Sequence, residues 1–148
     1  MKIKDLFKSK NKNSDEAFII AEIGHNHKGS LNIAKKLFDE AKKSGADAVK
    51  LQKRNNKILY TKQFYNSAYD NVNSYGKTYG EHRDALEFGR KEYKRLINYA
   101  KKLDLEFICT PFDIPSLEFL EDLNFPAYKI ASADLINTPL QKKIAETK

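Results

Sequence analysis

The sequence contains a single cysteine, Cys109, and lacks any long apolar run. One cysteine excludes a disulfide within the chain and suits a reducing compartment. The apolar stretches are shorter than the ~18–20 residues that a membrane span needs, and no stretch of signal-peptide kind follows the lysine-rich residues 1–17. These absences predict a cytoplasmic protein with no membrane segment. Cys109 follows Phe107 and Ile108 in an apolar run, which predicts a buried, structural thiol.

The chain also lacks the basic tail typical of nucleic-acid-binding proteins. Lys and Arg outnumber Asp and Glu by 27 to 20, giving a net charge of +7, but no Lys/Arg run is long enough for such a tail. This balance suits anionic metabolites such as phosphates and carboxylates. A nucleic-acid role rests on the charge alone and would predict binding that falls steeply with salt.

Short apolar runs alternate with helical patterns. A chain of 148 residues, 41% of them apolar, can form one domain with a real core. Four runs have strand character: residues 18–23, 46–51, 106–109 and 127–131. They read as continuous apolar segments, as parallel strands covered on both faces do.

Four helices are expected between and after these strands. The first begins after Ser30, a capping residue, and ends before Gly45. The others are expected at about residues 90–103, from near Asp113, and from Thr138 to Ala145. Alternation of this kind predicts a parallel α/β sheet with right-handed crossovers. Four βα units fit either half of a (β/α)8 barrel of ~250 residues or an open sheet.

A long insertion, about residues 53–89, follows the second expected strand. Segments longer than ~15 residues in a compact domain are usually functional or disordered. This one leaves the carboxyl end of a parallel strand, the edge where ligands bind in such folds. We interpret it as a loop that covers the substrate. The alternative is a surface loop without a role in binding.

Charged side chains interrupt the expected strands. Glu22, Lys50 and Lys129 lie within or at the end of apolar segments, where a charge is costly unless it is paired or used. If all three meet at one edge of the sheet, they form an anion-binding site. Ser132 and Asp134 follow Lys129 by a short turn and can add a hydroxyl and a carboxylate. Structural salt bridges and surface-directed lysines are the plain alternative.

Two further segments have simpler interpretations. Thr110 to Asp113 ends the third expected strand, and Asp113 is expected to cap the next helix. His25 and His27 lie in a glycine-bounded turn, and His82 is the only other histidine. Because no further His or Cys completes a ligand set, no metal site built wholly from this chain is expected.

Several of these segments together resemble the N-acetylneuraminate (sialic acid) synthase family. The first two strand ends, the segment from Lys77 to Phe88, and the ends of the last two strands match in the family's order. The matching segments are residues 20–29, 46–53, 77–83 with 86–88, 110–113 and 128–134. The resemblance spans residues 18–148, which would be the N-terminal half of a (β/α)8 TIM barrel covering its first four βα units, after a polar extension at residues 1–17.

The resemblance implies a reaction and roles for six residues. Phosphoenolpyruvate would condense with N-acetylmannosamine or a related amino-sugar aldehyde, giving a sialic-acid-type nonulosonate and phosphate. Glu22 would act on the attacking water or the sugar as base or orienter. Phosphoenolpyruvate would be held by Lys50, Lys129 and Ser132, and the sugar by Gln52 and Asp134.

The resemblance also implies groups outside this chain. The family uses a divalent metal, Mn or Mg, whose ligands are expected in a missing C-terminal half. A homodimer is expected at full length, and the 148-residue chain is expected to be inactive alone. Two other functions stay open: a Schiff-base aldolase using Lys50 or Lys129, and a free-standing module that binds a phosphorylated ligand without turnover.

Overall fold

A computed structural model describes residue 3 and residues 17–147 of the chain. Nearly all of the expected polar extension, residues 1–17, therefore lies outside the described residues. Three strands form a parallel sheet in the order β1 (Ile20–Gly24), β2 (Ala48–Lys53), β3 (Glu106–Pro111). The parallel α/β architecture expected from the sequence is thereby confirmed.

The four expected helices are present as α2 (Leu31–Lys43), α6 (Arg90–Lys102), α7 (Ile114–Glu121) and α8 (Thr138–Ala145). The capping residues act as expected. Ser30 Oγ accepts from the Ile33 amide at 3.3 Å, and Asp113 Oδ1 accepts from the Ser116 amide at 2.8 Å. Gly45 takes a φ of +82° just after α2, a conformation that favours glycine. Local polar signals therefore set these helix boundaries.

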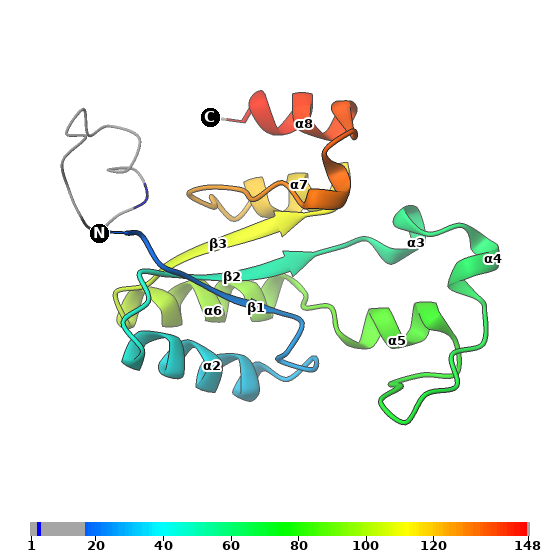
Figure 1. Ribbon diagram of the computed structural model, residues 1–148, viewed down its shortest axis with the longest axis horizontal. Coiled ribbons are helices and arrows are strands. Elements are labelled where there is room, and N and C mark those ends of the chain that lie inside the picture. The colour runs from blue at the N-terminus through cyan, green and yellow to red at the C-terminus, as the bar shows by residue number, and fades with distance from the viewer. Residues whose placement is uncertain (1–2, 4–16, 148) are drawn as a thin grey trace.

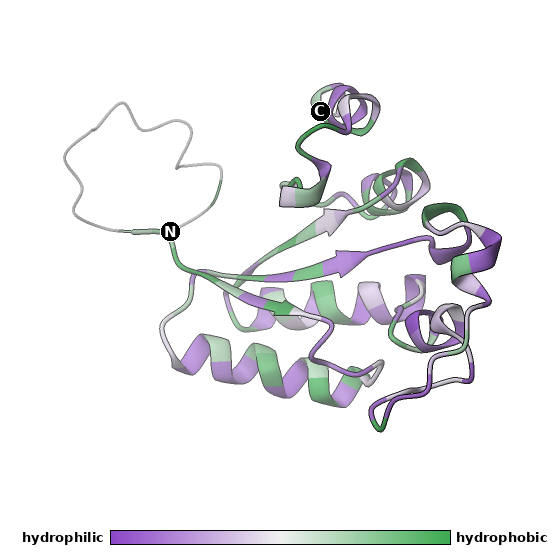
Figure 2. Cartoon of the chain, turned by 45° about the vertical axis from the view of Figure 1, so that its right-hand side comes forward, coloured by the Kyte–Doolittle hydropathy of each residue, from purple (hydrophilic) through white to green (hydrophobic). Residues whose placement is uncertain are grey.

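Helices α2 and α6 lie along one face of the sheet (Figure 1). Their apolar stripes face the strands (Figure 2), and the core between them is fully buried. Its largest members include Phe38, Tyr93, Leu96, Val49 and Leu51. Because successive strand residues point to opposite faces, Val49 and Leu51 pack into this core while Lys50 and Gln52 point the other way. The alternation of side chains along β2 therefore places its apolar residues in the core and its polar residues on the opposite face of the sheet.

The fourth expected strand, residues 127–131, does not form. Tyr128 makes only an isolated parallel bridge to Cys109, and the Lys129 amide donates to the Cys109 carbonyl at 3.0 Å. The chain then turns at once into the 3-10 helix η1 (Ser132–Asp134). A ladder needs successive pairings, so the segment runs beside β3 without extending the sheet.

The insertion contains short helices rather than continuous loop. These are α3 (Asn56–Leu59), α4 (Lys62–Tyr65) and α5 (Tyr79–Ala85), with a bridge between Ala68 and Thr78. Thr78 and Glu81 form a capping box at the start of α5, and their spacing of three residues is the local sequence signal for this helix. All three helices lie beyond the carboxyl ends of β1 and β2 (Figure 1). The insertion therefore lies at the edge expected for ligand binding.

No helix among residues 17–147 combines the length and the apolar character that crossing a membrane requires.

Cys109 is buried in the core, as expected. Its exposed fraction is 0%, and burial raises the pKa of its thiol to about 12. We expect the native thiol to react with a disulfide reagent at pH 8 at least ~100-fold more slowly than the urea-unfolded thiol, because the thiolate is the reactive form. The absorbance of the released aromatic thiolate measures both rates. Equal rates would contradict the burial.

Candidate functional site

A polar cavity of about 250 Å³ lies at the carboxyl end of the sheet. It is lined by side chains from all three strands and from the segment after α7. They are Glu22, Lys50, Gln52, Thr110, Phe112, Lys129, Ala131, Ser132 and Ala133. The parallel register explains the grouping, since Glu22 pairs with Lys50 across β1 and β2, and Gln52 pairs with Thr110 across β2 and β3. Five of the six predicted site residues thus meet in one place.

Lys50 and Glu22 form an ion pair in the cavity. Lys50 is only 8% exposed, and its Nζ lies 3.5 Å from Thr110 Oγ1. The Glu22 side chain is 53% exposed, so this carboxylate neutralises Lys50 from the open side of the site. A buried ammonium with one movable partner can bind a substrate anion when that partner is displaced.

Lys129 and Ser132 form the opposite wall and are both exposed. The Lys129 backbone is fixed by its bond to β3, and its Nζ donates to the Ile130 carbonyl at 2.5 Å. Ser132 begins η1. The cavity therefore brings two cations and a hydroxyl together, a combination that suits a carboxylate or a phosphate.

Asp134, the sixth predicted residue, does not line the cavity. Its Oδ1 accepts from Asn137 Nδ2 at 3.0 Å, and its carbonyl accepts from Gln141 Nε2 at 2.8 Å. The turn of η1 directs this carboxylate toward the start of α8 instead. Here Asp134 stabilises the η1–α8 connection, and the structure does not bring it to the other five residues.

Thr110 and Phe112 line the cavity, although no binding role was predicted for either. The signal that identifies them is the register, because Thr110 lies opposite Gln52. Asp113, the next residue, is the helix cap that the sequence indicated. Its second oxygen accepts from the Asn55 amide at 2.7 Å, which ties the insertion to α7.

A second polar cluster surrounds Glu87. Its Oε2 pairs with Lys53 Nζ at 2.9 Å, and its Oε1 lies 3.3 Å from His25 Nε2. Burial would raise the pKa of Glu87, but the bond to His25 and the charge of Lys53 outweigh it and leave that pKa below its usual value. The cluster therefore holds an ionised carboxylate and fixes His25.

The two histidines of the glycine-bounded turn have structural partners. His27 is buried, stacks on Phe88 with ring centroids 4.2 Å apart, and accepts from the Gly29 amide at 3.1 Å. His25 is engaged by Glu87. Within residues 17–147 no group of three or more His, Cys, Asp or Glu is placed to hold a metal ion.

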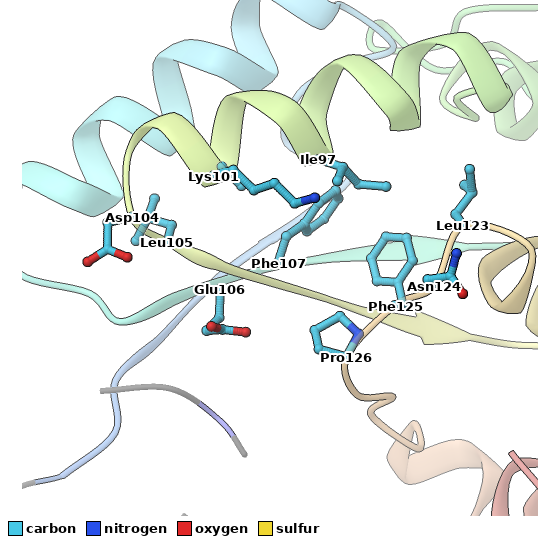
Figure 3. Close-up of a pocket in the computed structure, with 11 residues that line it drawn as sticks. Ile97, Lys101, Asp104, Leu105, Glu106, Phe107, Leu123, Asn124, Phe125 and Pro126 are labelled. Carbon is cyan, nitrogen blue, oxygen red and sulfur yellow. The ribbon is translucent and has the colours of Figure 1, made fainter. Parts of the chain in front are cut away.

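A larger hollow of about 500 Å³ lies at the amino end of β3 (Figure 3). It is bordered by α6 and the turn after α7, with Phe107 and Phe125 facing it. None of the predicted site residues lines it. Because ligand sites of parallel α/β folds lie at the carboxyl ends of the strands, the polar cavity is the candidate site.

Comparisons with known proteins agree with the resemblance. The model of the NeuB family matches residues 37–148. The N-acetylneuraminate-9-phosphate synthases of Drosophila melanogaster and Homo sapiens are 44% and 40% identical over 88% and 87% of this chain, covering 35% and 36% of their own lengths. The N,N'-diacetyllegionaminic acid synthase of Campylobacter jejuni is 38% identical over 88% of this chain and 40% of its own.

The fold agrees as well. The crystal structure of an N-acetylneuraminic acid synthetase from Leptospira borgpetersenii matches 90% of this chain and 42% of its own with a TM-score of 0.72 at 32% identity. The chain thus spans somewhat more than a third of the length of the curated relatives it matches. The family model covers most of the chain, and the fold and the relatives agree with it. The chain therefore belongs to the NeuB family of sialic acid synthases.

Proposed function

We propose that the protein condenses phosphoenolpyruvate with an amino-sugar aldehyde, N-acetylmannosamine or a close relative, to give a nonulosonate and phosphate. The observation that carries this proposal is the cavity that gathers Glu22, Lys50, Gln52, Lys129 and Ser132 from separate segments. N-acetylneuraminate-9-phosphate synthases and an N,N'-diacetyllegionaminic acid synthase are 38–44% identical over 87–88% of this chain. The family and the site therefore support the same chemistry.

Lys50 and Lys129 hold phosphoenolpyruvate in this proposal. The buried ammonium of Lys50 is best placed for the carboxylate, because it lies deepest and has Thr110 beside it. Lys129 and Ser132, on the exposed wall, suit the phosphate. In this proposal the carboxylate of phosphoenolpyruvate replaces the Glu22 carboxylate at Lys50, and the phosphate gains a second charge-assisted contact at Lys129 that Glu22 does not make.

Glu22 then becomes available to act on the reaction. Carbon C3 of phosphoenolpyruvate forms a bond to the aldehyde carbon, and the former aldehyde oxygen takes up a proton. Water adds to C2, and the bond from C2 to the phosphate oxygen then breaks, which leaves a carbonyl at C2 and releases phosphate with the second proton of the water. Glu22, released from Lys50, accepts the proton of the attacking water or orients it. Gln52, one pleat further along β2, donates to the sugar. Asp134 could contact the sugar only if η1 turned so that its carboxylate faced the cavity instead of Asn137.

A divalent metal, Mn or Mg, remains part of the proposal for the whole protein. When bound, it would polarise the aldehyde. The described residues do not fit a metal, since they include no cluster of three ligands and Glu22 is engaged by Lys50.

We also propose that the sheet is part of a (β/α)8 barrel in a cytoplasmic homodimer. Ile19 and Ile20 of the first strand region and Leu135 and Ile136 after η1 are exposed apolar residues. Neighbouring strands and helices of a closed barrel would cover such residues. The match to a synthetase structure at a TM-score of 0.72 supports this geometry.

The test is an assay of the full-length protein as its cell makes it, with phosphoenolpyruvate, N-acetylmannosamine and Mn²⁺. Phosphate release that depends on the sugar, with a product mass equal to sugar plus pyruvate, supports the proposal. Phosphate release that ignores the sugar would overturn it. The 148-residue chain assayed alone is expected to release none.

Reductive trapping separates this chemistry from a Schiff-base aldolase. Lys50 Nζ is held by the Glu22 carboxylate and lies beside Thr110 Oγ1, so it is not free to attack a carbonyl carbon as a Schiff-base lysine must. We therefore expect borohydride, added with pyruvate or the sugar, to leave the protein mass unchanged. A stable adduct on Lys50 or Lys129 would instead establish the aldolase.

A further inference from the structure

The insertion forms a small body of its own. Its helices α3, α4 and α5 pack mainly on one another and lie beyond the carboxyl ends of the strands (Figure 1). Aromatic rings join them. The ring of Tyr79 in α5 lies, between centroids, 4.6 to 5.5 Å from three other rings, those of Tyr60, Phe64 and Tyr69. The orientation of this body over the cavity therefore depends on how its two ends are attached.

Glu87 joins the two ends of the insertion. Residues 53 and 54 begin the insertion, and residues 87 and 88 close it; we call these four residues its neck. Glu87 Oε2 accepts from Lys53 Nζ at 2.9 Å and from the Arg54 amide at 3.3 Å. Lys53 Nζ also donates to the Phe88 carbonyl at 3.0 Å. One carboxylate thus holds the neck together.

The other oxygen of Glu87 ties the neck to the first strand. Oε1 lies 3.3 Å from Nε2 of His25, which directly follows β1. The Arg54 guanidinium lies beside the same ring, with Nη1 3.3 Å from His25 Nε2. It also stacks on Phe112, a residue of the cavity wall, with its carbon 3.7 Å from the ring centroid. A continuous chain of contacts therefore leads from Glu87 to the candidate site.

The pair of Glu87 and Lys53 is shielded from solvent. Their side chains are 11% and 13% exposed, so salt screens the pair little, and removing one charge leaves the other buried without it. The start of the insertion has further anchors. The Phe112 amide donates to the Lys53 carbonyl at 3.1 Å, and the Asn55 amide donates to Asp113. Loss of the Glu87 charge should therefore release the end of the insertion while its start stays attached.

We propose that Glu87 is a positioning residue that holds the insertion over the cavity and thereby sets how tightly the acceptor sugar binds. This inference rests on the proposed function, because it assigns a residue that serves the same site. Glu87 does not line the cavity and acts through the neck. Gln52, the proposed sugar contact, directly precedes the neck, whereas Lys50 lies deeper in β2. A displaced insertion should therefore weaken binding of the sugar more than binding of phosphoenolpyruvate.

Steady-state kinetics of Glu87→Gln in the full-length protein, with each substrate varied in turn, test this role. Glutamine keeps the shape of the side chain but removes its charge. We expect the KM for N-acetylmannosamine to rise at least ~10-fold and the KM for phosphoenolpyruvate to change less than ~3-fold. Glu118→Gln, the same change on the exposed side of α7, should leave both values within ~2-fold. An unchanged KM for the sugar, or an equal rise for both substrates, would overturn the proposal.

Hydrogen exchange tests the attachment without relying on catalysis. In Glu87→Gln the amides of α3, α4 and α5 should exchange at least ~10-fold faster than in the wild type, while those of α2 and β3 keep their rates. Acceleration in all of these elements alike, or none in the insertion, would contradict the positioning role. If Glu87→Gln fails to fold, Lys53→Met removes the same pair, leaves Glu87 beside His25, and should give the same selective exchange.

The two experiments also separate this inference from the proposed function. If the wild-type protein shows no sugar-dependent phosphate release, the condensation is wrong, and hydrogen exchange alone decides whether Glu87 holds the insertion. If the wild type condenses both substrates but the exchange of the insertion is unchanged in Glu87→Gln and Lys53→Met, the condensation stands and the positioning role is rejected.

Discussion

Lys50→Met is expected to lower kcat/KM for phosphoenolpyruvate by about a thousandfold, equivalent to ~4 kcal/mol. Lys50 is the buried cation of the cavity, and methionine keeps its length and packing but not its charge. The change leaves the Glu22 carboxylate without its partner, so the site changes from anion-binding to anion-repelling. Sugar-dependent phosphate release, measured over a range of phosphoenolpyruvate concentrations, gives the value.

Two further variants separate a lost site from a lost fold. Lys94→Met changes the same residue type on the exposed side of α6 and should leave kcat/KM within ~2-fold. Lys50→Arg keeps the charge but changes its shape and should recover part of the activity. If Lys50→Met retained more than a tenth of the wild-type kcat/KM, phosphoenolpyruvate would have to bind elsewhere.

The fold elements marked by local signals could be predicted from the sequence. Ser30, Gly45 and Asp113 set helix boundaries through contacts within a few residues, so their effect is visible in the sequence. The segment 127–131 was expected as a strand because it is apolar. An apolar segment can form either a strand or a buried loop. Whether residues 127–131 pair with β3 is decided by contacts with residues distant in the sequence.

The site residues that lie on strands could be predicted, because the alternation of side chains along a strand decides which of them face the cavity. Glu22, Lys50 and Gln52 meet because parallel strands align in register, which a strand assignment already implies. Asp134 was expected beside them, but the direction of its side chain depends on the turn of η1. The bond from the Asn55 amide to Asp113, which ties the insertion to α7, joins residues distant in sequence, so no local pattern indicates it.

Acid is expected to destabilise the protein through His27. This residue is 1% exposed, and burial, with a further contribution from the charge of His25, lowers its pKa to about 4. Its Nδ1 accepts a hydrogen bond from the Gly29 amide, which a protonated ring cannot do. The folded protein therefore holds a neutral imidazole.

The sign of the effect follows from proton counts. Between about pH 6.5 and 4 the unfolded chain binds a proton at His27 that the folded chain excludes, so stability falls as pH falls. The full loss is on the order of 3 kcal/mol, since each pKa unit is ~1.4 kcal/mol. His82, whose pKa is also lowered, acts in the same direction. The pKa of Glu87 lies below its usual 4.5, so its ionisation contributes to the loss only at the acid end.

Urea unfolding at pH 7.0, 6.0, 5.5 and 5.0 measures the free energy of unfolding within the window that histidine dominates. His27→Gln should lower stability at pH 7.0 but flatten most of its decline toward pH 5.0, because glutamine does not titrate and its oxygen can still accept from Gly29. His82→Gln should retain most of the decline, since His82 is less deeply buried. A decline as steep in His27→Gln as in the wild type would mean that the buried ring is protonated without penalty, and the acid sensitivity would belong to another group.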